Sequence, residues 1–382
     1  MTERLYIDVH VIQPVPPANL NRDDQGNPKE AVFGGVRRSR VSSQAWKRAT
    51  RLHVDDRLPQ PDRATRTRRV TAALTGRLTT GTGLVKEEAA RLAAALLARL
   101  GIKGGKKADD TAYLLFYGNA QLDAVAALVA GRERELADLG DADLTAAVAE
   151  LPVAQQFATG HPLGVALFGR MVADLPGLNV DAAVQVAHAL STHETQLEFD
   201  YFTAVDDQTG EDESGAGMIG SIGFNAATLY RYATVGFHAL CVNLGGDIAA
   251  AQDAVAAFVD GFARSVPTGY QNSFAHRTRP SLVAVVVRSD QPVNLVSAFE
   301  DPIATQAGLA SASARRLAEE HTTATAMWGD TPLFAAASHA FTADPRTKDT
   351  AEALEAAFGE PVAFPALLAG VHDSITQAWE NA

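Results

Sequence analysis

The sequence predicts an α+β fold, because strand-like and helix-like segments are mixed along the chain. Residues 5–12 alternate apolar and polar side chains, which is typical of a half-buried strand, and residues 282–288 form a short apolar segment of strand length. Between them, helical periodicity dominates residues 63–151. This mixture favours an α+β architecture, for which a ferredoxin-like or RRM-like sheet is one candidate.

The first predicted strand is followed by a polar loop and a helix. In the strand, Asp8 and His10 would face away from the core, and the prolines at 14, 16 and 17 would end it. After a polar loop at residues 19–28, Ser42 or Ser43 can cap a helix that continues past Arg51. One face of this helix is basic and the other can pack. The basic face holds Gln44, Lys47, Arg48 and Arg51, and the opposite face holds Ala45, Trp46, Ala49 and His53.

The remaining segments are mostly helical. Helical spacing recurs at residues 84–100, 181–193 and 247–264, and it is common from residue 294 to the end. Short apolar runs at 113–117 and 165–171 are strand candidates.

A long hairpin is predicted in the middle of the chain. Residues 199–205 and 228–233 are strand-like, and they flank residues 206–221, which are rich in glycine and acidic side chains. This pattern predicts two strands that carry an exposed, projecting loop.

Composition predicts a globular, soluble protein of the cytoplasm. The chain has 382 residues, of which 47% are hydrophobic and 20% charged. The single cysteine, Cys241, excludes an intrachain disulfide framework and a multi-cysteine zinc site, and it fits a reducing compartment. We find no signal-peptide pattern at the start and no apolar run of membrane-spanning length.

The net charge of −12 conceals an asymmetry along the chain. Residues 1–80 contain 15 Lys and Arg against 8 Asp and Glu, whereas the rest contains 18 against 37. A basic segment in an acidic chain indicates a surface that meets a polyanion. A solvated basic face paired with acidic neighbours explains the same numbers, and composition alone slightly favours that alternative.

Motifs for catalysis or cofactor binding are weak. Residues 101–107 are rich in Gly and Lys but lack the P-loop spacing, and His188 and His193 are five residues apart, which does not suit metal ligation on one helix face. We therefore expect no cofactor, no metal and no catalytic residue. His10 could act as a general base for RNA cleavage, but a structural hydrogen bond explains it more simply.

What remains is a recognition surface for a polyanion. Single-stranded nucleic acid is bound through phosphates and through apolar side chains that contact bases. The glycine pair Gly34-Gly35 would allow close approach of a ligand strand. Candidates for phosphate and backbone contacts are Arg22, Lys29, Arg37, Arg38, Ser42, Gln44, Lys47 and Arg51, and candidates for base contacts are Met171, Phe202, Met218 and Ile219.

Several blocks of sequence resemble the backbone subunit of type I-E CRISPR Cascade, the CasC family of the Cas-seven superfamily. The longest are LNRDD at 20–24 and FGGVRRSRVSSQAWKRATR at 33–51. Shorter ones follow in order: FTAVDD at 202–207, YRYA at 230–233, NLGG at 243–246, VP at 266–267 and AFE at 298–300.

This resemblance implies a hand-shaped, non-catalytic protein that forms a helical filament along CRISPR guide RNA. Copies would display guide bases for pairing with target DNA in antiviral defence, together with other Cascade subunits. An RRM-like palm would carry a helical fingers insertion and a hairpin thumb. The implied segments are palm at 1–60, fingers at 61–180, a palm helix at 181–194, the thumb at 195–225, and the rest of the palm with C-terminal helices at 226–382.

The resemblance also implies roles for single residues. Arg22, Lys29, Ser42, Gln44, Lys47 and Arg51 would hold the guide backbone, and Met171, Phe202, Thr203 and Ile219 would lie beside a displaced base. The acids Glu211, Asp212 and Glu213 depart from an RNA-binding thumb, because they would repel phosphates. Two alternatives stay open: an endoribonuclease that uses His10 or a thumb aspartate such as Asp206, and a structural subunit that contacts only protein.

Overall fold

The chain forms two compact units. The computed structural model describes residues 4–101, 110–111, 114–172, 175–205, 216–304, 308–342 and 344–380. The first unit combines residues 1–53, 185–235 and 255–382, and the second combines residues 54–184 and 236–254. Within these described ranges, no helix is both long and apolar enough to cross a membrane.

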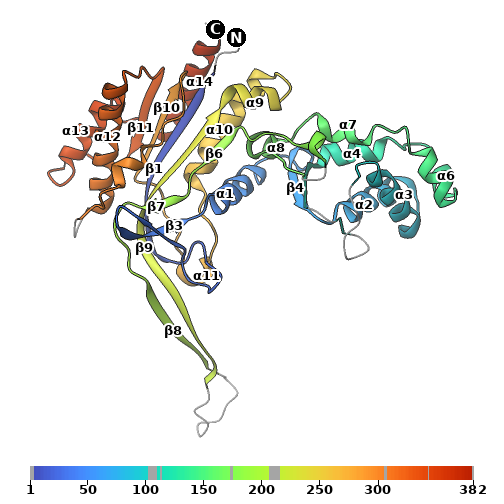
Figure 1. The fold of residues 1–382 in the computed structure, drawn as a ribbon, viewed down its shortest axis with the longest axis horizontal. Helices are drawn as coiled ribbons and strands as arrows, with labels where there is room; N and C mark the ends of the chain where they lie inside the picture. The colour runs from blue at the N-terminus through green and yellow to red at the C-terminus, as the bar shows by residue number, and fades with distance from the viewer. Residues whose placement is uncertain are drawn as a thin grey trace. The chain divides into compact units, whose positions relative to one another are not determined.

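The first unit is built on a large antiparallel sheet in the order β11-β10-β1-β9-β7-β3-β2 (Figure 1). The central pair runs from Tyr6↔Arg288 to Ile12↔Leu282. Two further strands, β6 and β8, pair with β9. The strands are β1 (Tyr6–Ala18), β2 (Glu30–Phe33), β3 (Val36–Val41), β6 (Val184–Val186), β7 (Ala189–Ser191), β8 (Glu198–Val205), β9 (Ala216–Gly236), β10 (Leu282–Arg288) and β11 (Phe334–His339).

Helices cover this sheet. Side chains of α12 (Leu309–Trp328) and α13 (Lys348–Phe358), among them Leu317 and Leu354, share one core cluster with Ile12 and Leu282 of the sheet. Helix α14 (Phe364–Glu380) packs on β10 and β11. All seven residues of β10 are buried, as expected for a strand that is covered on both faces. The mixed α+β prediction is confirmed.

The first unit contains further helical elements. They are α1 (Ser43–Asp55), the short α11 (Gln271–Phe274) and the 3₁₀ turn η3 (Leu295–Phe299); α10 (Ile248–Arg264) contributes residues to both units.

The second unit is mostly helical, as the periodicity of residues 63–151 predicts. Its core consists of leucines and valines from several helices, including Leu74, Leu92, Leu96 and Val125. A small two-stranded sheet joins β4 to β5. The elements are η1 (Gln60–Asp62), β4 (Ala64–Thr67), α2 (Val70–Thr82), α3 (Lys86–Ala98), β5 (Leu115–Gly118), α4 (Asn119–Ala127), α5 (Glu133–Ala137), α6 (Asp141–Ala147), α7 (Val153–Ala158), α8 (Leu163–Phe168), η2 (Pro176–Leu178) and α9 (Phe237–Asn243).

Several local predictions were wrong, among them the loop predicted at 206–221, of which residues 216–221 belong to strand β9. Residues 181–193 are not a helix but hold the short strands β6 and β7, because pairing with β9 overrides their local spacing. Residues 165–168 belong to the helix α8 rather than to a strand. Strand β1 continues past the prolines to Ala18; its pairing with β10 ends at Ile12, so the prolines lie beyond that ladder.

The second face of β1 is also buried, which contradicts the expected exposure of Asp8 and His10. Both side chains have 0% exposure. The Asp8 carboxylate accepts hydrogen bonds from Tyr232 Oη at 2.8 Å and from the Val293 amide at 2.9 Å, and it lies 3.3 Å from Arg288 Nε. Arg288 also pairs with Asp330 at 3.2 Å. A buried carboxylate requires such partners, so β1 can carry an acid in the core.

Beside this ion pair, His10 is locked into the same buried layer. Its Nδ1 lies 2.9 Å from Tyr230 Oη, and that hydroxyl donates to Asn294 Oδ1 at 3.1 Å. Burial, with smaller contributions from His321 and Arg288, lowers the pKa of His10 well below its usual value. The imidazole is therefore a neutral structural group inside the core.

Burial also gives Asp8 a role in the pH dependence of stability. It raises the pKa of Asp8 from 3.8 to about 6, because loss of hydration outweighs the hydrogen bonds and Arg288. The folded chain then binds a proton that the unfolded chain has released between these pH values, so the stabilising contribution is present below about pH 4 and lost above about pH 6.

We predict that Asp8→Asn removes this dependence. Between pH 4 and pH 6, the wild-type free energy of unfolding should fall by about 2 kcal/mol relative to that of the variant. Urea unfolding of both proteins at several pH values measures this difference. The other carboxylates contribute equally to both proteins, so their pH dependence cancels in it. Parallel curves for the two proteins would contradict the assignment.

Candidate nucleic-acid interface

Residues 19–29 form a closed loop at the end of β1. Asn19 Nδ2 donates to the carbonyl oxygens of Gly26 and Gly223, each at 2.9 Å, which ties the loop to β9. Inside the loop, Asp23 Oδ1 accepts from the amides of Gln25 and Asn27 at 2.9 Å. These are the short-range bonds by which Asx residues fix turns. The loop therefore holds a defined shape and presents the exposed Arg22 at its surface.

The same loop is fixed to the start of α1. The Ser42 amide donates to Asn21 Oδ1 at 2.9 Å, and the Lys29 amide donates to the Asn21 carbonyl at 2.9 Å. Ser42 Oγ accepts from the Ala45 amide at 3.4 Å, so it caps the helix. Ser42 is only 5% exposed, so its hydroxyl serves the helix end first.

Helix α1 has the two faces that its spacing predicts. Gln44 and Arg48 are exposed, while Lys47 and Arg51 are half-buried. Desolvation lowers the pKa of Lys47. Trp46 on the opposite face has 0% exposure and lies under the Arg231 guanidinium, 3.8 Å from the ring centroid. The packed face thus fixes the orientation of the basic face.

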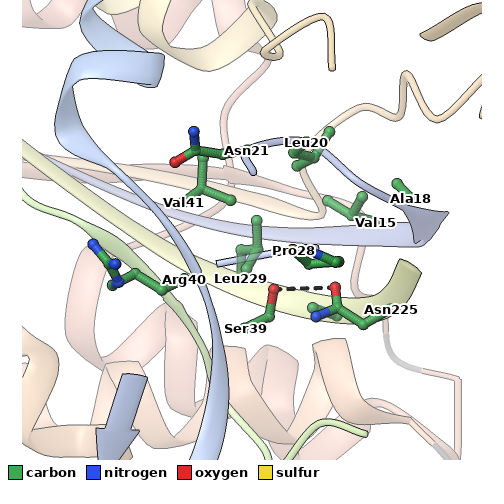
Figure 2. Close-up of a pocket in the computed structure, with 11 residues that line it drawn as sticks. Val15, Ala18, Leu20, Asn21, Pro28, Ser39, Arg40, Val41, Asn225 and Leu229 are labelled. Atoms are coloured by element: carbon green, nitrogen blue, oxygen red, sulfur yellow. Dashed lines mark hydrogen bonds between the residues drawn. The ribbon is translucent and has the colours of Figure 1, made fainter. Parts of the chain in front are cut away.

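A small cavity lies beneath the loop (Figure 2). Its volume of about 10 Å³ has room for roughly one water molecule and none for a base. Ser39 Oγ donates to Asn225 Oδ1 at 3.2 Å, and Asn225 Nδ2 has no hydrogen-bond partner among the described residues. The lining residues are Val15, Ala18, Leu20, Asn21, Pro28, Ser39, Arg40, Val41, Asn225, Ala227 and Leu229.

The adjacent arginines of β3 have opposite surroundings. Arg37 is exposed and pairs with Glu30 at 2.9 Å. Arg38 has 0% exposure, and its guanidinium donates to the carbonyl oxygens of Phe33, Ser191, Phe299 and Glu300 at 2.9–3.2 Å. The prediction that Arg38 contacts phosphates is contradicted, because its donors already bind buried carbonyls.

The hairpin of β8 and β9 separates the predicted base contacts. Phe202 covers Gly220 on the partner strand: a Cβ added to Gly220 would lie 2.3 Å from the ring's Cζ. Thr203 is exposed and pairs with Ile219. Successive side chains of a strand point to opposite faces, so Phe202 and Thr203 lie on different faces of the hairpin.

Other predicted residues fall elsewhere. Met171 follows α8 in the second unit and is 83% exposed. Ile219 and Met218 lie in β9. Asp206 and the acids Glu211, Asp212 and Glu213 lie outside the described residues. The structure thus brings Arg22, Lys29, Ser42, Gln44, Lys47 and Arg51 together through the loop and α1, and it places Phe202 and Thr203 on the hairpin.

Sequence reasoning missed residues that build or extend this surface. Asn19 and Asn21 hold the loop, and the only available signal was that asparagine commonly fixes turns. Phe199 and Tyr201 lie on the Thr203 face of β8 and are 62% and 66% exposed. Aromatic residues are common in strands, so their presence in this segment predicted a strand and gave no separate indication of binding.

The described residues offer little for metal or acid–base chemistry. No group of three or more His, Cys, Asp or Glu in the described ranges could hold a metal ion. His10, which the sequence suggested as a general base, is enclosed in the core.

The chain matches one family model and is similar to chains of known structure. A family model for CT1975-like protein matches residues 7–363. A chain from a solved "CRISPR RNA-guided surveillance complex, pre-nicking" is 34% identical, with a TM-score of 0.83 over 97% of this chain and 99% of that chain. A chain from another "CRISPR RNA-guided surveillance complex" is 29% identical, with a TM-score of 0.74 and the same coverage. No curated protein matches the chain.

The adjacent arginines give a matched pair of variants. Arg38→Gln leaves buried carbonyl oxygens without donors, so we expect it to lower the free energy of unfolding by about 3 kcal/mol. Arg37→Gln removes an exposed ion pair and should change it by less than about 1 kcal/mol. Urea unfolding measures both, and similar losses for the two variants would contradict the assignment.

Proposed function

The chain belongs to the CT1975-like protein family, and on that premise we propose that it is a Cas-seven-type backbone subunit of a CRISPR RNA-guided surveillance complex. The similar chains come from complexes named as RNA-guided, and the match covers almost the whole of each chain. We further propose that the complex is of type I-E, as the sequence blocks at 20–24 and 33–51 indicate, and that it acts in antiviral defence.

The observation that carries this proposal is the fixed basic surface formed by the loop 19–29 and α1. Arg22, Lys29 and Lys47 carry positive charge, and Gln44 adds a hydrogen-bonding amide. Such groups suit phosphates and sugars, which have the same chemistry at every nucleotide. A guide of any sequence could therefore bind, while its base edges stay free for pairing with target DNA.

We assign the parts of the hand to the two units. The first unit would supply an RRM-like palm and the β8–β9 hairpin a thumb, and the second unit would supply the helical fingers. Phe202 and Thr203 lie on opposite faces of the hairpin. One of them would then contact a displaced guide base, and the other would contact the nucleotides next to it. Met171 and Ile219 remain predicted base contacts.

Self-assembly is part of this proposal. An open hollow beside Gly34 is lined by four carboxylates, those of Glu300, Asp301, Glu319 and Glu320, with Arg316 among them. In a filament, the acidic surface of one copy could face a basic surface of the next copy. Other Cascade subunits would complete the assembly.

We propose a binding role without catalysis. The alternative of a ribonuclease that uses His10 is disfavoured, because that side chain is buried and hydrogen-bonded to Tyr230. A subunit that contacts only protein would not need the exposed Arg22 and the basic face of α1.

Replacing two lysines of the surface tests the proposal. With Lys29→Gln and Lys47→Gln combined, the affinity of the full chain for single-stranded RNA should fall by a similar factor for unrelated sequences. The slope of log K against log salt concentration should decrease by about 0.7 for each phosphate that the variant no longer neutralises. Fluorescence anisotropy across a salt series measures both quantities.

The matched control replaces two exposed lysines elsewhere, Lys86→Gln and Lys348→Gln, and should keep the wild-type slope. Equal slopes for all three proteins, or a loss confined to particular RNA sequences, would contradict phosphate binding by this surface.

A further inference from the structure

A second segment of the first unit, beside the loop 19–29, carries an unusual backbone. Helix α11 is flanked by Tyr270 at φ 47° and Ala275 at φ 44°, both left-handed residues other than glycine. Each such conformation costs on the order of 1–3 kcal/mol and persists only where its surroundings enforce it. The contacts of residues 266–280 show what enforces it here.

Residues 266–280 are built against β1 and the loop 19–29. Gly269 lies so close to the loop that an added Cβ would be 2.4 Å from the Asn19 carbonyl oxygen and 2.6 Å from that of Leu20. Further along, Thr278 Oγ1 donates to the Pro14 carbonyl at 2.6 Å, and Gln13 Nε2 donates to the Thr278 carbonyl at 2.9 Å. The segment is therefore anchored at both of its ends.

Aromatic and histidine contacts hold its middle. The Phe274 ring lies 5.8 Å from that of Phe224 on β9 and meets the Tyr270 ring edge-on at 6.4 Å. His276 bonds across the segment to the Pro267 carbonyl at 3.0 Å. The strained turn is thus fixed in one position on the surface.

This position adds positive charge to the loop. The Arg22 guanidinium lies over the Tyr270 ring, 4.7 Å from its centroid, a cation–π contact that orients Arg22. Arg277 and Arg279, on either side of the anchored Thr278, are exposed. Residues 265–289 contain no Asp or Glu, so the local field of this segment is positive within an acidic chain.

We propose that residues 266–280 form a second wall of the RNA surface, in which Arg277 and Arg279 contact backbone phosphates and Tyr270 positions Arg22. This inference rests on the proposed function. It extends the surface from the first 51 residues to a segment more than 200 residues later in the chain.

The double variant Arg277→Gln and Arg279→Gln tests the phosphate contacts in the full chain with single-stranded RNA. The salt slope should fall by about 1.4, or about 0.7 for each phosphate that is no longer neutralised, and by the same amount for unrelated sequences. The control Arg315→Gln and Arg346→Gln removes the same charge from exposed sites elsewhere and should keep the wild-type slope. A wild-type slope in the Arg277/Arg279 variant would overturn these contacts.

Tyr270 is tested as a positioning residue by a double-mutant cycle with Arg22. Tyr270→Phe keeps the ring and should keep the affinity, whereas Tyr270→Leu should lose as much affinity as Arg22→Gln, with little added loss in the combined variant. Additive losses would overturn the positioning role. Absence of RNA binding by the wild type would instead refute the proposed function itself. If Lys29→Gln and Lys47→Gln lower the salt slope as predicted, but Arg277→Gln and Arg279→Gln leave it at the wild-type value, only this inference is refuted.

Discussion

The burial of β1 on both faces is the constraint on which the rest of the first unit depends. A strand between two covered faces exposes no side chain to a ligand along its buried length. Its polar residues must then be paired inside, which explains why Asp8 meets Arg288 and Tyr232, and why His10 meets Tyr230. The same burial removes the one imidazole that could have suggested catalysis.

The surface that we propose for RNA binding lies at the end of the strand. Where β1 leaves its partner β10, the loop 19–29, the start of α1 and residues 266–280 all contact the strand or one another. These segments are distant in sequence, and each is held by side-chain bonds to main-chain atoms rather than by regular pairing. The proposed cations are therefore carried by segments that side-chain hydrogen bonds tie to their surroundings, which suits a ligand recognised by its backbone.

The sequence predicts what local periodicity decides and misses what distant partners decide. The two faces of α1 and the buried strand β10 follow from spacing alone. Residues 181–193 have helical spacing, yet pairing with β9 makes strands of them. Arg37 and Arg38 are indistinguishable in sequence, and only the carbonyl groups of Ser191, Phe299 and Glu300 decide that Arg38 is structural. Arg277 and Arg279 gave no signal, because only the fold brings Thr278, which lies between them, to Pro14.

We propose that this chain binds single-stranded RNA through the sugar–phosphate backbone of the RNA, with the same affinity whatever the bases. The most direct measurement is the dissociation constant of the wild-type chain for unstructured RNAs of equal length and very different composition, over a range of salt concentrations. The account predicts constants within a few-fold of one another and a common linear dependence on log salt concentration. Affinities that differ by orders of magnitude between sequences, or that do not respond to salt, would contradict it.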